Sequence, residues 1–215
     1  MRCYRGEIIM KKIIMSLSLI TSLSLTGYVF ASTNIGDPAS GKNKISECVA
    51  CHTETGISIV SSYPHLAGQN ARYLAKQIAD IQSGSRNVPE MMPFVGDLSS
   101  QDITDIAAYY ASQTAASGAA NPKLATLGKS LYMSGNAKKQ MMACAGCHTA
   151  NGTGNSLAGY PNISGQQADY TAKQLRAFRE SERTNDGDAQ VMRTIAGKLS
   201  NREIDALASY ISGLR

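Results

Sequence analysis

The chain has 215 residues and a formal net charge of +5, from 21 Lys and Arg against 16 Asp and Glu. This length suggests one or two domains. The charge is low, there is no tryptophan, and basic and aromatic residues do not cluster together, so the composition argues against a nucleic-acid-binding protein.

The first segment is typical of export. Lys11 and Lys12 form a charged start, an apolar and serine-rich run follows, and Val29-Phe30-Ala31 ends it in a cleavage site. We predict that residues 1–31 are a cleaved secretory signal peptide whose true start is Met10. The alternative is a retained transmembrane anchor, but the run is short and rich in Ser and Thr. The predicted leader has a net charge of +3, so the mature protein would have a net charge of +2. We expect the mature protein in the periplasm.

The next distinctive segment is CVACH at 48–52, which returns as CAGCH at 144–148. A disulfide in each pair suits an exported protein, and a zinc site could use such pairs with two more ligands per domain. C-x-x-C-H is also the signature of covalent c-type haem attachment. Two of the three histidines directly follow a second cysteine, which haem attachment requires and a disulfide does not. We therefore predict haem thioethers at Cys48, Cys51, Cys144 and Cys147, with His52 and His148 as axial ligands of the iron.

Two longer segments are repeated in the same order. YPHLAGQNARYLAKQI at 63–78 returns as YPNISGQQADYTAKQL at 160–175. LSSQDITDIAAYYAS at 98–112 returns as LSNREIDALASYISG at 199–213. The offsets are similar, 97 and 101 residues, so the chain is a tandem duplication.

An alanine-rich segment separates the two copies. Residues 114–123 are small and end in Asn121-Pro122, which is typical of a linker. We place a first domain at 32–116 and a second domain at 117–215.

Each copy is predicted to be helical. Ile103, Ile106 and Tyr110 are spaced like one face of a helix. Ile204, Leu207 and Ile211 repeat this spacing in the second copy. Ser-x-x-Asp/Glu capping pairs, Ser99 with Asp102 and Ser200 with Glu203, predict where the two helices begin. A middle helix of the first copy is predicted from Tyr73, Leu74, Gln77, Ile78 and Ile81, and Gly84 ends it. A further helix should precede each cysteine pair, and strand patterns are nearly absent, so the predicted fold class is all-α.

A methionine is expected on the other side of each iron. A His/Met pair gives an electron-transfer centre, whereas an open position would favour ligand binding or peroxide chemistry. In the second copy only Met192 follows the haem motif, seven residues before Leu199. Subtracting the local offset of 101 gives Met91, while the neighbouring Met92 matches Arg193. We predict Met91 and Met192 as axial ligands and Met92 as a packing residue.

Two prolines occupy equivalent places after the histidines. A ligating histidine donates its other N–H to a fixed acceptor. Pro64 and Pro161 lie 12 and 13 residues after their histidines, and a proline keeps its carbonyl although it lacks an N–H. Each proline therefore either accepts that hydrogen bond or only shapes a turn. The third histidine, His65, matches Asn162 in the second copy and is expected on the surface rather than as a ligand.

Together with the tandem C-x-x-C-H motifs and the repeated YP-x-[LI]-x-GQ and AKQ segments, the stretch FRESERTNDGDAQVMR at 178–193 resembles the cytochrome c4 family, the di-haem class I cytochromes c of bacteria. The resemblance implies two tandem class I cytochrome c domains that face each other, with two covalently bound c-type haems. It also implies the axial pairs His52/Met91 and His148/Met192, and carbonyls of Pro64 and Pro161 behind the histidines. One departure is that four residues lie between Arg86 and Met91, whereas eight lie between Arg183 and Met192.

The resemblance also implies a function. Such a protein carries electrons in the periplasm from an upstream quinol-oxidising complex towards a terminal oxidase, as a monomer without substrate turnover of its own and with loose peripheral membrane contact. Two alternatives remain: a haem enzyme such as a di-haem peroxidase, which would need an open iron and usually further histidines, and a permanent electron-accepting subunit of a larger oxidoreductase.

The charges of the two copies differ in sign. Residues 32–116 hold 5 basic and 8 acidic residues, a net −3, and residues 117–215 hold 12 and 7, a net +5. We expect a dipolar molecule whose second domain docks on an acidic partner or an anionic membrane surface, because such fields steer encounter. The lysines proposed for this contact, which could otherwise be ordinary solvated residues, are Lys123, Lys129, Lys138 and Lys139.

Overall fold

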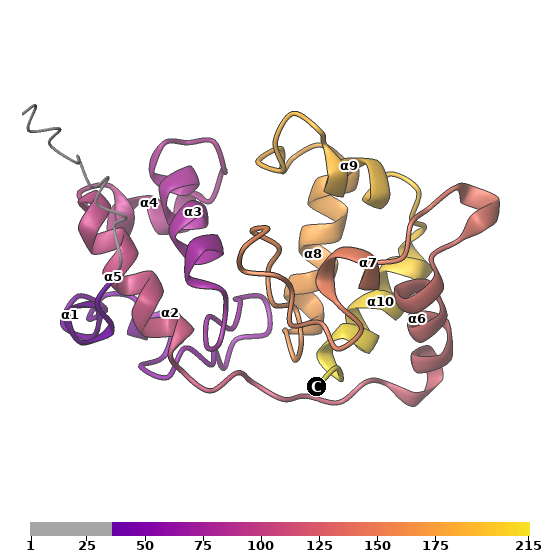
Figure 1. Ribbon diagram of the computed structural model, residues 1–215, viewed down its shortest axis with the longest axis horizontal. Helices are drawn as coiled ribbons and strands as arrows, with labels where there is room; N and C mark the ends of the chain where they lie inside the picture. Colours follow the sequence, from indigo (N-terminus) through magenta and orange to yellow (C-terminus); the bar gives the residue numbers. More distant parts are fainter. Residues whose placement is uncertain (1–35) are drawn as a thin grey trace, which may run out of the picture. The chain divides into compact units, whose positions relative to one another are not determined.

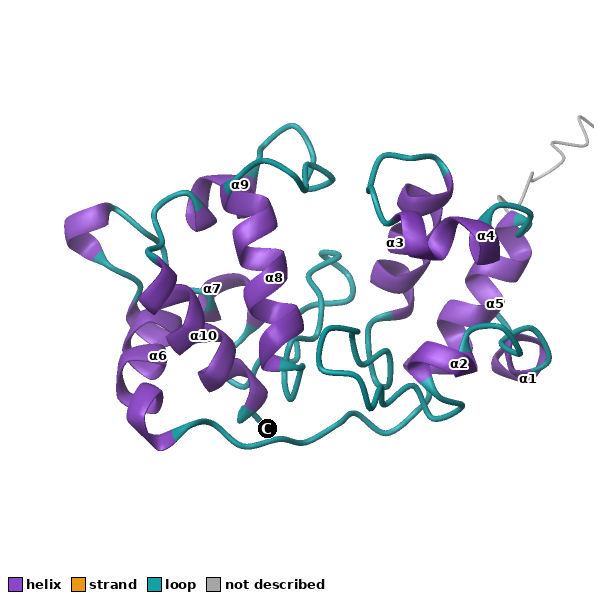
Figure 2. Cartoon of the chain, turned by 180° about the vertical axis from the view of Figure 1, so that it is seen from behind, coloured by secondary structure: helices purple, strands orange, loops and turns teal. Residues whose placement is uncertain are grey.

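The computed structural model describes residues 36–215. The predicted signal peptide at 1–31, the start at Met10 and the first residues of the predicted first domain lie outside the described residues. Within 36–215 the secondary structure is helical, with two isolated β-bridges, Asn136–Met141 and Asn155–Tyr160, and no strand (Figure 2). The all-α prediction is therefore confirmed. None of the described helices has the length and apolar character needed to cross a membrane.

The helices form two groups, one for each copy of the repeat (Figure 1). The first group consists of α1 (Pro38–Lys42), α2 (Val49–His52), α3 (Ala71–Gln82), η1 (Pro89–Met91), α4 (Met92–Val95) and α5 (Ser100–Ala111). The second group consists of α6 (Pro122–Ser134), η2 (Ala137–Lys139), α7 (Ala145–His148), α8 (Ala168–Arg179), α9 (Val191–Ala196) and α10 (Asn201–Ser212). Residues 114–121, between the groups, are without helix or strand.

The last helix of each group begins with the predicted capping box. The Ser99 side chain accepts from the Asp102 N–H, and the Asp102 carboxylate accepts from the Ser99 N–H. Ser200 and Glu203 form the same reciprocal pair at the start of α10. Because each box satisfies two N–H groups that lack a helical partner, both helix starts are set by local sequence.

Two glycines let helices cross closely in equivalent places. A Cβ atom at Gly41 in α1 would lie 2.1 Å from the carbonyl oxygen of Asp105 in α5. A Cβ atom at Gly128 in α6 would lie 2.2 Å from the carbonyl oxygen of Ala206 in α10. Only glycine fits at such distances, so these residues fix how the opening helix packs against the last helix of each domain.

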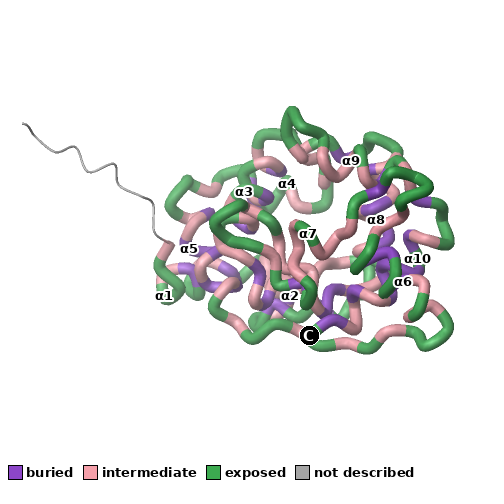
Figure 3. Tube along the Cα trace, turned by 45° about the vertical axis from the view of Figure 1, so that its right-hand side comes forward, coloured by how far each residue is buried: buried purple, intermediate pink, exposed green. Residues whose placement is uncertain are grey.

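Each domain has its own small core along its last helix, as the buried segments of α5 and α10 in Figure 3 indicate. Tyr110 is 1% exposed and Ile204 is fully buried, as the predicted stripes require. The middle helices α3 and α8 pack against α5 and α10 respectively. Helices this short leave space between α3, α5 and the cysteine motif, and between α8, α10 and the second motif, and that space is the site described next.

Candidate functional site

The predicted haem-binding residues of both domains line one continuous cavity of about 1520 Å³. Pockets for a single small ligand usually measure roughly 300–1,000 Å³, so this cavity has room for more than one such group. The predicted ligands on its walls are Cys48, Cys51, His52, Met91, Cys144, Cys147, His148 and Met192.

Both histidines lie at the ends of one-turn helices and point the same ring nitrogen at a proline. His52 Nδ1 lies 3.1 Å from the carbonyl oxygen of Pro64, and His148 Nδ1 lies 3.1 Å from that of Pro161. A carbonyl only accepts, so Nδ1 carries the proton in each ring and Nε2 keeps its lone pair. Burial lowers the pKa of both histidines, which favours the neutral ring that a metal needs.

The surroundings of the two histidines are also alike. The His52 ring lies 6.4 Å from the Tyr63 ring, tilted by 51°, and the His148 ring lies 6.4 Å from the Tyr160 ring, tilted by 52°. The duplication therefore preserves the geometry around the rings. The hydrogen bonds favour the acceptor role over a mere turn-shaping role for the two prolines, and their part toward an iron stays a prediction.

No disulfide joins any of the four motif cysteines within residues 36–215. Burial raises the pKa of Cys48, and raises that of Cys144 to about 11, so neither is poised as a thiolate. Among residues 36–215 there is no group of three or more His, Cys, Asp or Glu side chains arranged to hold a metal ion. Neither the disulfide nor the zinc interpretation has support here, and the residues present fit covalent attachment of a large, mostly apolar group.

The two neighbouring methionines of the first domain differ in position. Met91 lines the cavity, whereas Met92 is 41% exposed and is not among the described lining residues. Met192, in the first turn of α9, lines the cavity and packs against the core of the second domain. This placement favours Met91 over Met92 as the ligand, in line with the internal alignment, and the assignment stays a prediction.

The expected surface position of His65 is wrong. Its Nδ1 is buried, and its backbone N–H donates to Gln166 Oε1 of the second domain at 2.8 Å. Gln166 Nε2 donates back to the His65 carbonyl at 2.9 Å. Gln69 and Asn162 make the mirror-image pair at 2.8 and 2.7 Å. Both positions thus meet the other domain through their backbone, and the Asn162 side chain also donates to the Gly68 carbonyl at 3.0 Å.

Two arginines join the domains beside the cavity, a role that the sequence comparison missed. Arg183 donates to Tyr73 Oη at 3.0 Å and to Gln77 Oε1 at 2.8 Å, both in the first domain. Arg86 donates to Tyr170 Oη at 3.0 Å in the second domain. Tyr73 and Tyr170 are 97 residues apart, and so are Arg86 and Arg183. This shared spacing was the signal from which the two arginine–tyrosine contacts could have been predicted.

The proposed docking lysines fall into two kinds. Lys139 forms an ion pair with Glu203 and donates to the Lys198 carbonyl, so part of its charge is used inside the domain. Lys123, Lys129 and Lys138 are exposed and form no described ion pair.

Comparisons with known proteins agree with this geometry. The family described as cytochrome c matches residues 125–215, and the family described as cytochrome c oxidase, cbb3-type, subunit III, matches residues 39–109. Both matches fall within the predicted domains, whose bounds stay a prediction. Cytochrome c4 of Stutzerimonas stutzeri is 48% identical over 206 residues, which cover 92% of this chain and 97% of that protein.

The chain is also similar to a solved cytochrome c4 structure and, at lower identity, to an electron acceptor protein. The crystal structure of reduced recombinant cytochrome c4 from Pseudomonas stutzeri matches with a TM-score of 0.82 at 50% identity, and covers 84% of this chain and all of that one. A thiosulfate dehydrogenase electron acceptor from Stutzerimonas stutzeri (strain A1501) is 32% identical over 177 residues, which cover 78% of each chain.

Proposed function

The chain belongs to the cytochrome c4 family, and on that premise we propose that it carries electrons in the periplasm, from a quinol-oxidising complex to a terminal oxidase. It is a di-haem electron-transfer protein with two cytochrome c domains and two covalently bound c-type haems. In the proposed role it turns over no substrate of its own.

The proposed roles of the residues follow from their positions. Bound at these sites, the two haem irons supply one-electron redox chemistry. Cys48 and Cys51 would hold one haem and Cys144 and Cys147 the other. His52 and His148 would present Nε2 to the iron, because their Nδ1–H groups are committed to the proline carbonyls 3.1 Å away. Met91 and Met192, which line the same cavity, would each supply a thioether sulfur as the second protein ligand.

The continuous cavity is the observation that carries this proposal. Both sets of predicted ligands line it, so the two sites share one cavity. A carrier benefits from two closely placed centres, whereas an enzyme needs one site left open to its substrate. Each set of predicted ligands here includes its own methionine on the cavity wall, Met91 in the first domain and Met192 in the second.

A redox titration of the intact holoprotein with optical detection tests the proposal. We expect two haems per chain and a sulfur–iron charge-transfer band from each in the oxidised form. Carbon monoxide should bind poorly to both reduced haems, because a histidine and a methionine would hold each iron. Strong binding of carbon monoxide to one haem would instead support a haem enzyme.

A second candidate is a permanent electron-accepting subunit of a larger oxidoreductase. The observation in its favour is the 32% identity to a protein described as a thiosulfate dehydrogenase electron acceptor. The 48% identity to cytochrome c4 over nearly the whole of both proteins favours the free carrier. Purification of the untagged protein from its host separates the two, because a subunit would elute with a larger partner and a carrier alone.

A further inference from the structure

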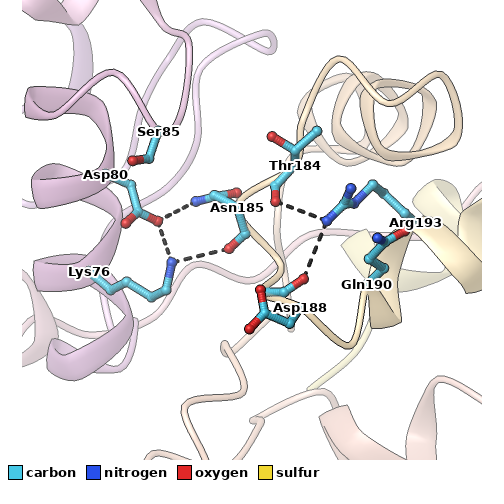
Figure 4. A pocket seen from close by; sticks show the side chains of 9 residues that line it. Lys76, Asp80, Ser85, Thr184, Asn185, Asp188, Gln190 and Arg193 are labelled. Atoms are coloured by element: carbon cyan, nitrogen blue, oxygen red, sulfur yellow. Dashed lines mark hydrogen bonds and ion pairs between the residues drawn. The ribbon is translucent and has the colours of Figure 1, made fainter.

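The two methionine loops differ in length, and the extra residues of the second loop make specific contacts. Arg183 precedes Met192 by nine residues, whereas Arg86 precedes Met91 by five. The longer loop borders a polar hollow of about 450 Å³ against α3 (Figure 4).

Asp186 in this loop holds the residue directly after Met192. Its Oδ2 accepts from the Arg193 backbone N–H at 2.9 Å, and its Oδ1 accepts from Arg193 Nε at 2.7 Å. The Asp186 side chain is only 5% exposed and that of Arg193 19%. The same guanidinium donates to the carbonyls of Thr184 and Gly187 at 3.2 and 3.3 Å (Figure 4). The start of α9 is thus tied to its own loop by a buried, charge-assisted contact.

Asn185, the residue before Asp186, ties the same loop to the first domain. Its amide donates to Asp80 Oδ2 at 2.6 Å and to Gln77 Oε1 at 2.9 Å, both on α3. Lys76 Nζ, also on α3, donates to the Asn185 carbonyl at 3.1 Å and pairs with Asp80 (Figure 4). The loop that carries Met192 is therefore anchored at both ends.

The loop of the first domain has no side-chain anchor before its methionine or at the residue after it. The side chains of residues 87–90 form no described hydrogen bond, and the exposed Met92 takes the place of Arg193. The contact with α3 comes later in the chain, where Gln82 Nε2 donates to the carbonyls of Val95, Gly96 and Leu98 at 2.8, 3.1 and 2.8 Å. Met91 is held by its backbone N–H, which donates to the Val88 carbonyl at 3.0 Å. Among the described residues, Met192 packs against the core of its domain, and Met91 is not part of the corresponding cluster.

We propose that Asp186 and Arg193 are positioning residues that lock Met192 in place, so that imidazole, a small nitrogen ligand, exchanges with Met91 at the oxidised first haem well before it exchanges with Met192 at the second. The step is a ligand substitution: the bond from the thioether sulfur to iron breaks, a bond from the entering nitrogen forms, and no electron is gained or lost. The inference rests on the proposed axial roles of the two methionines.

Imidazole titration of the oxidised holoprotein, followed by the sulfur–iron band, tests this. We expect half of the band to disappear at an imidazole concentration at least about tenfold below that needed for the other half, because charge-assisted hydrogen bonds must break only at the second site. Met91→Ala should remove the half that is lost first. Loss of both halves at one concentration would overturn the inference.

Two variants test the positioning residues themselves. Asp186→Asn should shift the second half of the titration about tenfold toward the first, and Arg193→Gln should shift it in the same direction but less, since the backbone bond to Asp186 remains. Asp188→Asn makes the same charge change in the same loop at an exposed residue without a described ion pair, and should change nothing. If neither variant changes the imidazole concentration at which the second half of the band disappears, Asp186 and Arg193 do not position Met192.

Failure of the axial assignment would look different. If Met91→Ala and Met192→Ala both leave the full band in place, the ligands are wrong and the proposed sites fail. If each removes one half, but wild-type imidazole exchange is uniform, the sites stand and only the locking role fails.

Discussion

Arg183 donates a hydrogen bond to the Tyr73 hydroxyl across the domain boundary, at 3.0 Å. The arginine is 8% exposed and has no carboxylate among its hydrogen-bond partners; it bonds instead to tyrosine, glutamine and asparagine oxygens. A buried cation is costly unless its N–H groups are satisfied, so the two acceptors in the first domain, Tyr73 and Gln77, contribute to the association of the two domains.

Replacing Tyr73 by Phe should destabilise the holoprotein. The change leaves one N–H of Arg183 with fewer acceptors, at a cost of about 1–3 kcal/mol. For a chain of this size, each kcal/mol corresponds to roughly 2–4 °C in Tm. Thermal unfolding followed by circular dichroism measures the effect. The control is Tyr210→Phe, since that hydroxyl has no described hydrogen bond and its loss should be nearly neutral. Equal shifts in the two variants would contradict the role of the Tyr73 bond.

Separate replacement of the two neighbouring methionines should separate their roles. Met91→Ala should abolish the sulfur–iron band of the first haem and leave that of the second, because only Met91 of this pair lines the cavity. Met92→Ala should leave both bands, since the side chain is 41% exposed. Absorption spectra of the oxidised variants decide the matter. Loss of the band in Met92→Ala alone would reverse the assignment.

The crossing of α6 and α10 gives a stability prediction. Gly128→Ala would place its Cβ 2.2 Å from the Ala206 carbonyl oxygen and 2.6 Å from Tyr210 Cβ. Backbone atoms cannot yield like a flexible side chain, so we expect at least about 1–3 kcal/mol of destabilisation, measured by chemical unfolding. Lys129→Ala changes the next, exposed residue of the same helix and should have little effect. An unchanged stability of Gly128→Ala would mean that the helices are not this close.

Glu203 should contribute to stability in a pH-dependent way. Burial alone would raise its pKa, but Lys139 and the Ser200 cap outweigh it and lower the pKa from 4.5 to about 2. A carboxylate whose pKa is lowered by folding stabilises the native state above its unfolded pKa, and this contribution is lost as the pH falls through the folded value. The stability difference between wild type and Glu203→Gln should therefore be full above about pH 5 and shrink toward pH 2.

Urea unfolding at several pH values, followed by circular dichroism, measures that difference. Glu182→Gln makes the same change at an exposed carboxylate with no described ion pair, and should give a small difference across the range. A difference for Glu203→Gln that stays constant from neutral to acid pH would show that the ion pair with Lys139 does not contribute.

The proposed docking face can be tested at its unpaired lysines. Reversal of charge at Lys123, Lys129 and Lys138 should slow electron transfer with an acidic redox partner and flatten the dependence of the rate on ionic strength, because steering is screened by salt. Stopped-flow kinetics over a range of salt concentrations measures this. At high salt the variant and wild type should converge. An unchanged salt dependence would mean that these lysines are only solvated surface residues.

Local and repeated features of this protein could be predicted from its sequence, because their signals lie within a few residues. One or two helical turns of sequence are enough to recognise the apolar stripe through Ile103 and Ile106. The same holds for the capping boxes at Ser99 and Ser200. The cavity-lining positions of Met91 and Met192 followed from aligning the two copies, since one unambiguous methionine resolved an ambiguous pair.

Contacts between the copies could not be predicted in the same way. His65 and Gln166 are 101 residues apart, and nothing in the residues around either names the other as its partner. The Lys139 ion pair with Glu203 also joins distant segments, 64 residues apart, and it turns one expected docking lysine into a partly structural one. The contacts of Asp186 with Arg193 depend on how the longer methionine loop folds back on α9, which composition does not reveal.

The reciprocal contacts of Gln69 with Asn162 and of Gln166 with His65 have a consequence for the symmetry of the protein. When residue i of one copy meets residue j of the other, and residue j of the first meets residue i of the second, the interface has the two-fold symmetry of an isologous dimer. Each copy of the repeat carries both sides of this contact. The covalent link between the copies makes their pairing intramolecular, so it does not depend on protein concentration.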